Sequence, residues 1–370
     1  MTFTVVTRNF RQEFERWTDA LDKANELRGQ LKSWFTDIRV FDDGELVWMY
    51  SKLRAHPEYI GPGTYGRLVR QFVAEAEAEK VQRSPWQFRE QTFNWGSRTY
   101  LMGVLNVTPD SFSDGGQFNT IETALAQAHR LHDGGMDLLD IGGQSTRPGA
   151  EQISLSEELN RVVPVIEAMR ADPTLENTVI SVDTTRATVA RAAIEAGADI
   201  INDISGGTYE PDMLKAAADL NVPIMLMHLR GTPETMQQMT DYEDVVAEIG
   251  EFLKTQIEAA EAVGVPRQNI CIDPGIGFAK SYSQNLTILR ELNRLEPLGC
   301  PLLVGVSRKS FIGWVLDQPD PQQRVWGTAA ACTAAIAGGA DILRVHDGAE
   351  MADVAKMADA IWRGTTAAGE

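Results

Sequence analysis

Two segments of the chain combine residue types that could bind an anion. The first, NVTPDSFSDGG, spans residues 106–116, and the second, GGQSTRPG, spans residues 142–149. Both join glycine and proline to hydroxyls and charged side chains, a composition typical of polar loops that carry function. In the second segment Arg147 follows Ser145 and Thr146, so a guanidinium and hydroxyls occur beside glycine backbone N–H groups. That combination suits a phosphate group.

Two further basic residues stand near the C-terminus. Arg344 and His346 are two positions apart in a β-rich run, which places both side chains on one side of a strand. Together with Arg147 and Lys309 they could form an anion site. The chain carries a formal net charge of −18, so a local cluster of cations, and not the overall field, must attract an anionic substrate.

Three polar residues that end separate apolar runs could bind a heterocycle: Asp183, Asn202 and Asp273. A carboxylate accepts two hydrogen bonds side by side, which matches the N–H edge of a guanidine-like ring, and Asn adds one donor and one acceptor. Each aspartate taken alone could instead cap a helix or pair with a structural arginine.

The elements that must position these residues begin at Tyr100, where short apolar runs alternate with helical stretches. The runs are residues 100–107, 138–143, 179–184, 200–204, 223–229, 270–275, 302–307 and 342–347. Near-continuous apolar runs are typical of strands buried on both faces of a parallel sheet. Eight such βα units favour an α/β fold of the (β/α)8 TIM-barrel type, although a doubly wound sheet has the same local pattern.

The ends of these runs support the barrel. They carry the polar residues Asn106, Asp140, Asp183, Asn202, His228, Asp273, Ser307, Arg344 and His346. Catalytic groups of TIM barrels stand at the C-terminal ends of strands and in the loops that follow. Polar residues can also simply mark where strands stop, but that interpretation is weak when every run shows the pattern.

Residues 1–85 have a different pattern, and we expect them to form a small α+β domain of unknown function ahead of a barrel in residues 86–370. Apolar residues at three- and four-residue steps from Phe10 to Trp34 predict an amphipathic helix. Two β-rich runs around Asp42-Asp43-Gly44 predict a hairpin, and residues 67–82 predict a second helix. The expected order is helix–hairpin–helix.

Residues 91–101, QTFNWGSRTYL, predict a further short hairpin that leads into the first barrel strand and plugs the barrel floor.

Composition excludes several classes of protein. No apolar run approaches the ~18 residues that a membrane span needs, and the early charges do not fit a signal peptide. The acidic body disfavours binding to nucleic acid or to an anionic membrane. Cys271, Cys300 and Cys332 are widely spaced, which disfavours disulfides or zinc and indicates a reducing cytoplasm.

From about Trp95 to Arg363 the chain resembles the dihydropteroate synthase family. The family's strings MGVLNVTPDSFSDGG, STRPG, SVDT, INDI, LMH, DPGIGF, VGVSRKSF and RVHD occur in order. The resemblance implies a transferase of folate biosynthesis that condenses hydroxymethyl-dihydropterin diphosphate with p-aminobenzoate to give dihydropteroate and diphosphate. It further implies a magnesium cofactor and competition by sulfonamides at the p-aminobenzoate site. We also expect a homodimer.

The resemblance implies a role for each matching position. The residues that would hold or line the pterin are Asp183, Asn202, Met227, Asp273, Phe278 and Lys309. Those that would contact the diphosphate or close over it are Thr146, Arg147, Arg344 and His346. Asn106 would contact the Mg²⁺ that binds the diphosphate, and Ser310 would frame the p-aminobenzoate site with the two loops.

A catalytic set follows from these roles: Asp114, Arg147, Lys309, Arg344 and His346. Asp114 would stabilise the developing positive charge or hold the closed first loop. The implied reaction needs no strong base, because an arylamine is already nucleophilic. One position departs from the family: Gln144 replaces the glutamate of the usual GGESTRPG, which puts the anchoring of the second loop in doubt.

Three other functions share part of this residue pattern. A pterin-dependent methyltransferase shares the barrel and the pterin pocket, but it binds no diphosphate, so Arg147, Arg344 and His346 argue against it. A non-catalytic pterin-binding protein would not need Asp114 or an intact second loop. A Schiff-base aldolase could use Lys309, although in the family that lysine forms no covalent bond.

Overall fold

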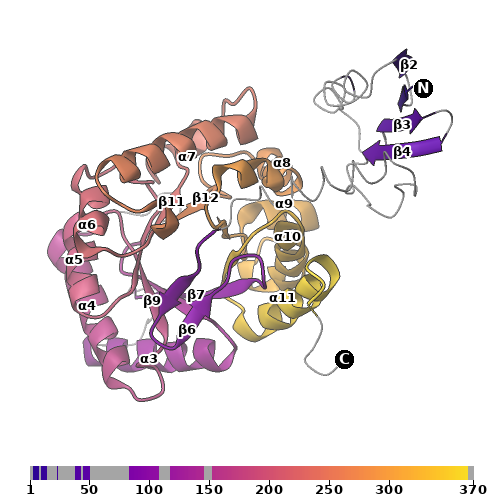
Figure 1. Ribbon diagram of the computed structural model, residues 1–370. Helices are drawn as coiled ribbons and strands as arrows, with labels where there is room; N and C mark the ends of the chain where they lie inside the picture. Colours follow the sequence, from indigo (N-terminus) through magenta and orange to yellow (C-terminus); the bar gives the residue numbers. More distant parts are fainter. Residues whose placement is uncertain are drawn as a thin grey trace. The chain divides into compact units, whose positions relative to one another are not determined.

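The computed structural model describes two units of the chain, Met1–Gln82 and Arg83–Glu370. The residues that it describes are 3–7, 10–14, 23, 38–42, 45–50, 83–107, 117–145 and 152–365. The first unit contains an antiparallel sheet in the order β2-β1-β3-β4. Its strands are β1 (Phe3–Thr7), β2 (Phe10–Phe14), β3 (Ile38–Asp42) and β4 (Glu45–Tyr50), shown in indigo in Figure 1.

The predicted hairpin of this unit is confirmed, and the beginning of the predicted first helix is wrong. Strands β3 and β4 pair antiparallel, with Asp42 opposite Glu45. Phe10–Phe14 forms strand β2, which pairs with β1, and is not helical. The physical reason lies in the spacing, because a four-residue step fits both a helical turn and the even alternation of a strand. Apart from the helical Lys23, the rest of both predicted helices lies outside the described residues.

The second unit is an α/β barrel, as predicted. Its parallel strands are β7 (Tyr100–Asn106), β8 (Leu138–Gly142), β9 (Val179–Asp183), β10 (Ile200–Asp203), β11 (Ile224–Met227), β12 (Ile270–Asp273), β13 (Leu303–Val304) and β14 (Ile342–Val345). The strand order β12-β11-β10-β9-β8-β7-β14-β13 follows the chain around a ring, unlike a doubly wound sheet. A parallel bridge between Ile272 and Leu302 nearly closes it, next to the short β13.

Helices surround this sheet (Figure 1). They are α3 (Gln117–Asp133), α4 (Leu155–Ala171), α5 (Ala187–Glu195), α6 (Asp212–Leu220), α7 (Val245–Ala262), α8 (Tyr282–Arg290), α9 (Ser310–Leu316), α10 (Val325–Ala337) and α11 (Gly348–Trp362). Short 3-10 helices occupy Met236–Gln238, Arg267–Asn269, Leu292–Leu298 and Pro321–Arg324. The local sequence determines where some of these helices begin. At the start of α8, for example, Ser281 and Gln284 form a capping box.

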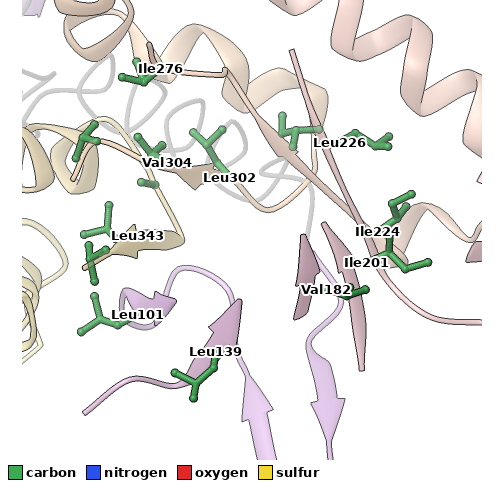
Figure 2. Packing of buried hydrophobic residues seen from close by; sticks show 14 of the residues in the cluster. Leu101, Leu139, Val182, Ile201, Ile224, Leu226, Ile276, Leu302, Val304 and Leu343 are labelled. Atoms are coloured by element: carbon green, nitrogen blue, oxygen red, sulfur yellow. The ribbon is translucent and has the colours of Figure 1, made fainter. Parts of the chain in front are cut away.

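The main core lies between the sheet and the helices. Leu101, Leu139, Val182 and Leu343 of four strands all belong to it (Figure 2). Because successive side chains of a strand point to opposite faces of the sheet, the residues next to these on each strand face the barrel interior. No helix in the described part of the chain is long and apolar enough to cross a membrane.

A hairpin closes the barrel floor. It consists of β5 (Trp86–Phe88) and β6 (Gln91–Phe93), paired antiparallel. Trp86 and Phe93 form one buried cluster with the first interior residues of the strands, including Tyr100. The predicted floor plug is therefore confirmed. Its pairing was predicted wrongly, because Gln91–Phe93 pairs with the preceding residues and not with those that follow.

Candidate active site

A pocket lies at the C-terminal ends of the strands, where barrels place their catalytic groups. Its lining residues are Val104, Asn202, Ile204, Met227, Asp273, Ile276, Phe278, Gly305, Ser307, Lys309, Arg344 and His346. The structure thus brings together the predicted pterin residues with Arg344 and His346, except that Asp183 does not line this pocket. Arg344 on β14 and His346 directly after that strand both line the pocket, as their spacing predicted.

Arg344 is the centre of a buried charge network. Its Nε donates to Asp140 Oδ2 at 2.6 Å, and its Nη2 donates to Asp183 Oδ2 at 2.8 Å. Asn202 Nδ2 also donates to Asp140 Oδ2, at 3.1 Å, and Ser181 Oγ donates to Oδ1 at 2.8 Å. Asp140 is fully buried, so these donors replace the water that its carboxylate would otherwise need.

Sequence reasoning recognised Asp140 as a polar residue of a strand but assigned it no role in the site. A signal was present: a charged residue lies in the middle of β8, whose five residues are all buried. A carboxylate in such a strand requires a buried partner. The sequence could not indicate that this partner is Arg344, because the two residues are 204 positions apart.

The two aspartates predicted to bind the heterocycle both have a raised pKa. Burial raises the pKa of Asp183 to about 7, although the charge of Arg344 acts in the opposite direction. Burial raises the pKa of Asp273 to about 6, opposed by a backbone hydrogen bond and by Lys309. That hydrogen bond runs from the Gly275 N–H to Asp273 Oδ1, at 2.7 Å. Groups of this kind gain from additional N–H donors, which a ligand can supply.

The remaining walls of this slot are largely apolar. Phe278 and Met227 line it, as predicted, together with Ile204. The Lys309 Nζ lies 4.1 Å from the centroid of the Phe278 ring. Burial, followed by the charge of Arg344, lowers the pKa of Lys309 to about 8. The slot therefore combines apolar walls with polar groups that include both donors and acceptors.

His346 contributes hydrogen bonding and no charge. Its Nδ1 lies 3.0 Å from Ser307 Oγ. Burial, followed by the charges of Arg344 and Arg308, lowers the pKa of the imidazole to about 3. Because the ring is neutral near pH 7, the cations of the expected anion site in the described residues are Arg344 and Lys309.

Other predicted residues lie at the edge of the pocket or beyond the described ranges. Asn106 ends β7 opposite Gly142 of β8, but it does not line the pocket. Ser310 is the exposed first residue of α9. Asp114, Thr146 and Arg147 lie outside the described residues.

Gln144 anchors the start of the second loop. Its Oε1 accepts the backbone N–H of Ile153 at 2.8 Å, and its Nε2 donates to the Ser145 carbonyl at 3.0 Å. The amide thus joins Ser145, within the loop, to Ile153, which follows it. Arg186 holds the far end as well, because its Nη2 donates to the Ile153 carbonyl at 2.6 Å and its Nη1 pairs with buried Glu158. The neutral side chain at position 144 can therefore serve as an anchor.

Known proteins share this chain's sequence over the barrel. The family model described as pterin binding enzyme matches residues 102–346. A dihydropteroate synthase of Synechocystis sp. is 57% identical over 279 residues, which are 75% of this chain and 96% of that protein. A dihydropteroate synthase of Bacillus subtilis is 46% identical over 273 residues, 74% of this chain and 92% of that protein. The folic acid synthesis protein fol1 of Pneumocystis carinii is 43% identical, but the match spans 39% of that protein.

Solved structures agree. Dihydropteroate synthase of Xanthomonas albilineans in complex with 7,8-dihydropteroate matches with a TM-score of 0.67 and 43% identity, covering 75% of this chain and 98% of that one. The Yersinia pestis enzyme with a sulfonamide drug matches with a TM-score of 0.70 and 42% identity, covering 76% of this chain and all (100%) of that one.

The fold, the pocket and these matches define a pterin binding enzyme. The chain belongs to the dihydropteroate synthase family, whose members are transferases of folate biosynthesis. This family is favoured over the pterin-dependent methyltransferase, the non-catalytic binding protein and the aldolase considered from the sequence.

Proposed function

We propose that this chain transfers the pterin-methyl group of hydroxymethyl-dihydropterin diphosphate to the amino nitrogen of p-aminobenzoate, forming dihydropteroate and releasing diphosphate. The observation that carries the proposal is the pocket that Asn202, Asp273 and Arg344 line together. The Arg344 guanidinium also pairs with Asp183 beside it. Solved relatives in complex with 7,8-dihydropteroate, the product of this reaction, and with 4-aminobenzoic acid, one of its substrates, support the proposal.

In this proposal the pocket binds the pterin by its edge and its two faces. Asp273 accepts hydrogen bonds from ring N–H groups, and Asn202 complements the rest of that edge. Lys309 donates to a ring acceptor. Phe278 and Met227 cover the two faces, where burial of apolar surface adds affinity. Asp183 completes the site while it balances the charge of Arg344.

The diphosphate needs donors at the mouth of the pocket. We assign this role to Arg344 and His346, with Thr146 and Arg147 of the second loop. An Mg²⁺ ion would be held by the amide oxygen of Asn106, which ends a barrel strand and is partly exposed. One hard oxygen ligand fits an ion that usually takes its other ligands from phosphate and water. When bound, Mg²⁺ neutralises charge on the departing diphosphate.

The reaction then needs positioning more than proton transfer. The C–O bond to diphosphate breaks and its electron pair leaves with the diphosphate, while the arylamine lone pair forms the new C–N bond. The arylamine nitrogen afterwards loses a proton to water or to the leaving group. The electron-rich pterin supports the positive methylene, and Asp114 of the first loop stabilises it or keeps the loop closed. Ser310 and the loops frame the p-aminobenzoate.

We further propose a homodimer in the cytoplasm, with no nucleic acid or membrane partner. Large apolar side chains on neighbouring helices support the dimer, because Trp314 of α9 and Trp326 of α10 are 58% and 82% exposed. Exposed apolar surface of this kind is typical of an interface. The cysteines in the described part of the chain are free and buried, which suits a reducing compartment.

The test is an assay of the purified protein with pterin diphosphate, p-aminobenzoate and Mg²⁺, measuring dihydropteroate and diphosphate together. Arg344→Ala should reduce turnover by at least a hundredfold, because two buried carboxylates lose their cation and the diphosphate loses a donor. Arg294→Ala is the matched control, since Arg294 also bridges two carboxylates, Asp244 and Glu291, but on the surface. A folded wild-type protein that forms no dihydropteroate would contradict the proposal.

A further inference from the structure

A buried lysine that none of these roles uses lies behind the pocket wall. Lys280 is 2% exposed and follows β12 by a short loop. Its Nζ donates to the carbonyl oxygen of Phe278 at 2.8 Å and contacts His228 Nδ1 at 3.0 Å. An amino group of this kind is costly to bury unless its donors are satisfied. These two contacts offset that cost and hold the side chain in one position.

The partner, His228, follows β11 and is also 2% exposed. Burial, followed by the charges of Lys280 and Arg230, lowers the pKa of His228 to about 2, so the ring is neutral and Nδ1 can accept. The ring packs edge-on against Phe252, with centroids 4.9 Å apart. The His228 backbone N–H donates to the Asp273 carbonyl at 2.9 Å. His228 thus connects the lysine to the strand that carries the pterin carboxylate.

The segment between Asp273 and Lys280 is held on several sides. Gly275 has a φ of +69°, and a Cβ atom there would lie 2.1 Å from the His228 carbonyl oxygen, so the two backbones are in direct contact. The Gly277 N–H donates to Asn285 Oδ1 at 2.6 Å. Phe278 lies between these contacts and Lys280. Its ring faces the pocket while its carbonyl is held from behind by the ammonium.

We propose that Lys280 is a positioning residue for the transfer reaction. By joining the Phe278 carbonyl to the His228 ring, it fixes the segment Gly275–Lys280 and therefore the Phe278 ring and the Asp273 carboxylate that bind the pterin. Lys280 itself touches no substrate. Its charge also favours the ionised form of Asp273. The inference rests on the proposed function only in that the ligand of the pocket is a pterin.

The first test is Lys280→Met, which keeps the length of the side chain and removes both donations. The loss of two buried hydrogen bonds should raise the Kd for a pterin by about tenfold or more. The KM for p-aminobenzoate at saturating pterin diphosphate should stay within about twofold, because Lys280 acts on the pterin side alone. Calorimetry with a free pterin and steady-state kinetics give the two values.

The matched control is Arg170→Met. Arg170 also donates to backbone carbonyls, those of Gly197 and Thr178 at 2.9 and 2.8 Å, and pairs with Asp199. These contacts lie where β9 and β10 begin, at the opposite end of the barrel from the pocket. The control should lower the thermal stability and leave the Kd for the pterin within about twofold.

His228 provides the second test. His228→Phe keeps a ring but removes the acceptor, whereas His228→Asn keeps an acceptor near the position of Nδ1 and loses the ring. We expect His228→Phe to lose pterin affinity as Lys280→Met does, and His228→Asn to lose stability but keep most of the affinity. In the double variant of Lys280→Met and His228→Phe the two losses should not add, because the two side chains act as one unit.

An unchanged pterin Kd in Lys280→Met, or an equal loss in Arg170→Met, would overturn the proposal. If Lys280→Met does not fold, the two His228 variants decide: equal pterin affinity in both would also overturn it. Failure of the proposed function is seen separately, as an absence of dihydropteroate from the wild-type protein that nevertheless binds pterin.

Discussion

Two buried carboxylates lie near Arg344, Asp273 in the pocket wall and Asp183 beside it, and their surroundings give them different tasks. Asp183 is paired with Arg344, whose Nη2 lies 2.8 Å from its Oδ2. Asp273 has no such close guanidinium and accepts instead from the Gly275 backbone. A ligand with N–H donors therefore gains more from Asp273, since the pairing needs of Asp183 are already met within the protein.

We expect Asp273→Asn to lower the affinity for a pterin at least tenfold. The variant keeps the size of the side chain but turns one acceptor into a donor, which would face ring N–H groups. A mismatched buried hydrogen bond costs on the order of 1–3 kcal/mol. Calorimetry measures the change, and circular dichroism confirms the fold. Unchanged binding in a folded variant would remove Asp273 from the pterin site.

Pterin binding should also depend on pH. Burial raises the pKa of Asp273 to about 6 and that of Asp183 to about 7. In the free protein the protonated form of each carboxyl therefore adds to the free energy of unfolding at low pH, and this contribution is lost as the pH rises through these pKa values. A pterin binds the ionised form of Asp273, so its affinity should rise up to about pH 6 and then level off. The shift in Tm caused by the ligand should be larger at about pH 8 than at about pH 5, and Asp273→Asn should lose the step near pH 6.

The residues of the site could be predicted from the sequence where they stand at the ends of apolar runs. Asp183, Asn202 and Asp273 follow apolar runs, and the barrel brings such ends together. Asp140 and Lys280 received no role because their importance depends on partners that are distant in sequence, Arg344 and His228. Spacing along a chain carries no information about such pairs.

Among the elements, the eight barrel strands were predictable because each is buried on both faces and therefore reads as an apolar run. Short strands were less predictable from the sequence. Phe10–Phe14 pairs with a neighbouring strand and is not helical, and β6 pairs with β5 on its N-terminal side. In both cases the partner decides the structure, and the residues of one short strand do not specify the partner.

The floor hairpin should contribute stability and no catalysis. Trp86 is 4% exposed, and its Nε1 donates to the Gln268 carbonyl at 2.6 Å. Trp86→Ala should lower the free energy of unfolding by about 3–5 kcal/mol, as for other buried aromatic residues, with kcat and KM within about twofold. Urea unfolding and kinetics measure these effects. Gln87→Ala, on the same strand but exposed, serves as the control, and a large loss of kcat in Trp86→Ala would connect the floor to the chemistry.

At the scale of the whole molecule, the unit Arg83–Glu370 contains every described residue that lines the pocket. We therefore expect a protein that begins at Arg83 to keep its turnover within a few-fold. A protein that begins at Trp86 should be less stable, because it lacks the Arg83 guanidinium that pairs with buried Asp341 and the Ser84 carbonyl that accepts from Trp95. Kinetics and thermal unfolding of both truncations provide the measurement.

Complete loss of activity in a folded protein that begins at Arg83 would assign residues 1–82 a part in catalysis. A change in oligomeric state or solubility alone, with turnover kept, is the expected result. It would leave the first unit with a role outside the active site.

The barrel sheet closes between β12 and β13, and we call this place the joint. Its few hydrogen bonds matter when the substrate binds. Strand β13 is two residues long, and in the described sheet a single bridge joins Ile272 of β12 to Leu302, the residue directly before β13. Asp273 lies on one side of this joint and Lys309 on the other, and both line the pterin pocket. A pterin held by both side chains adds hydrogen bonds across the place where the sheet supplies few. We therefore expect the substrate to complete the closure of the barrel. The amide hydrogens of Leu303 and Val304 should then exchange with solvent more slowly in the complex than in the free protein, which hydrogen exchange measures.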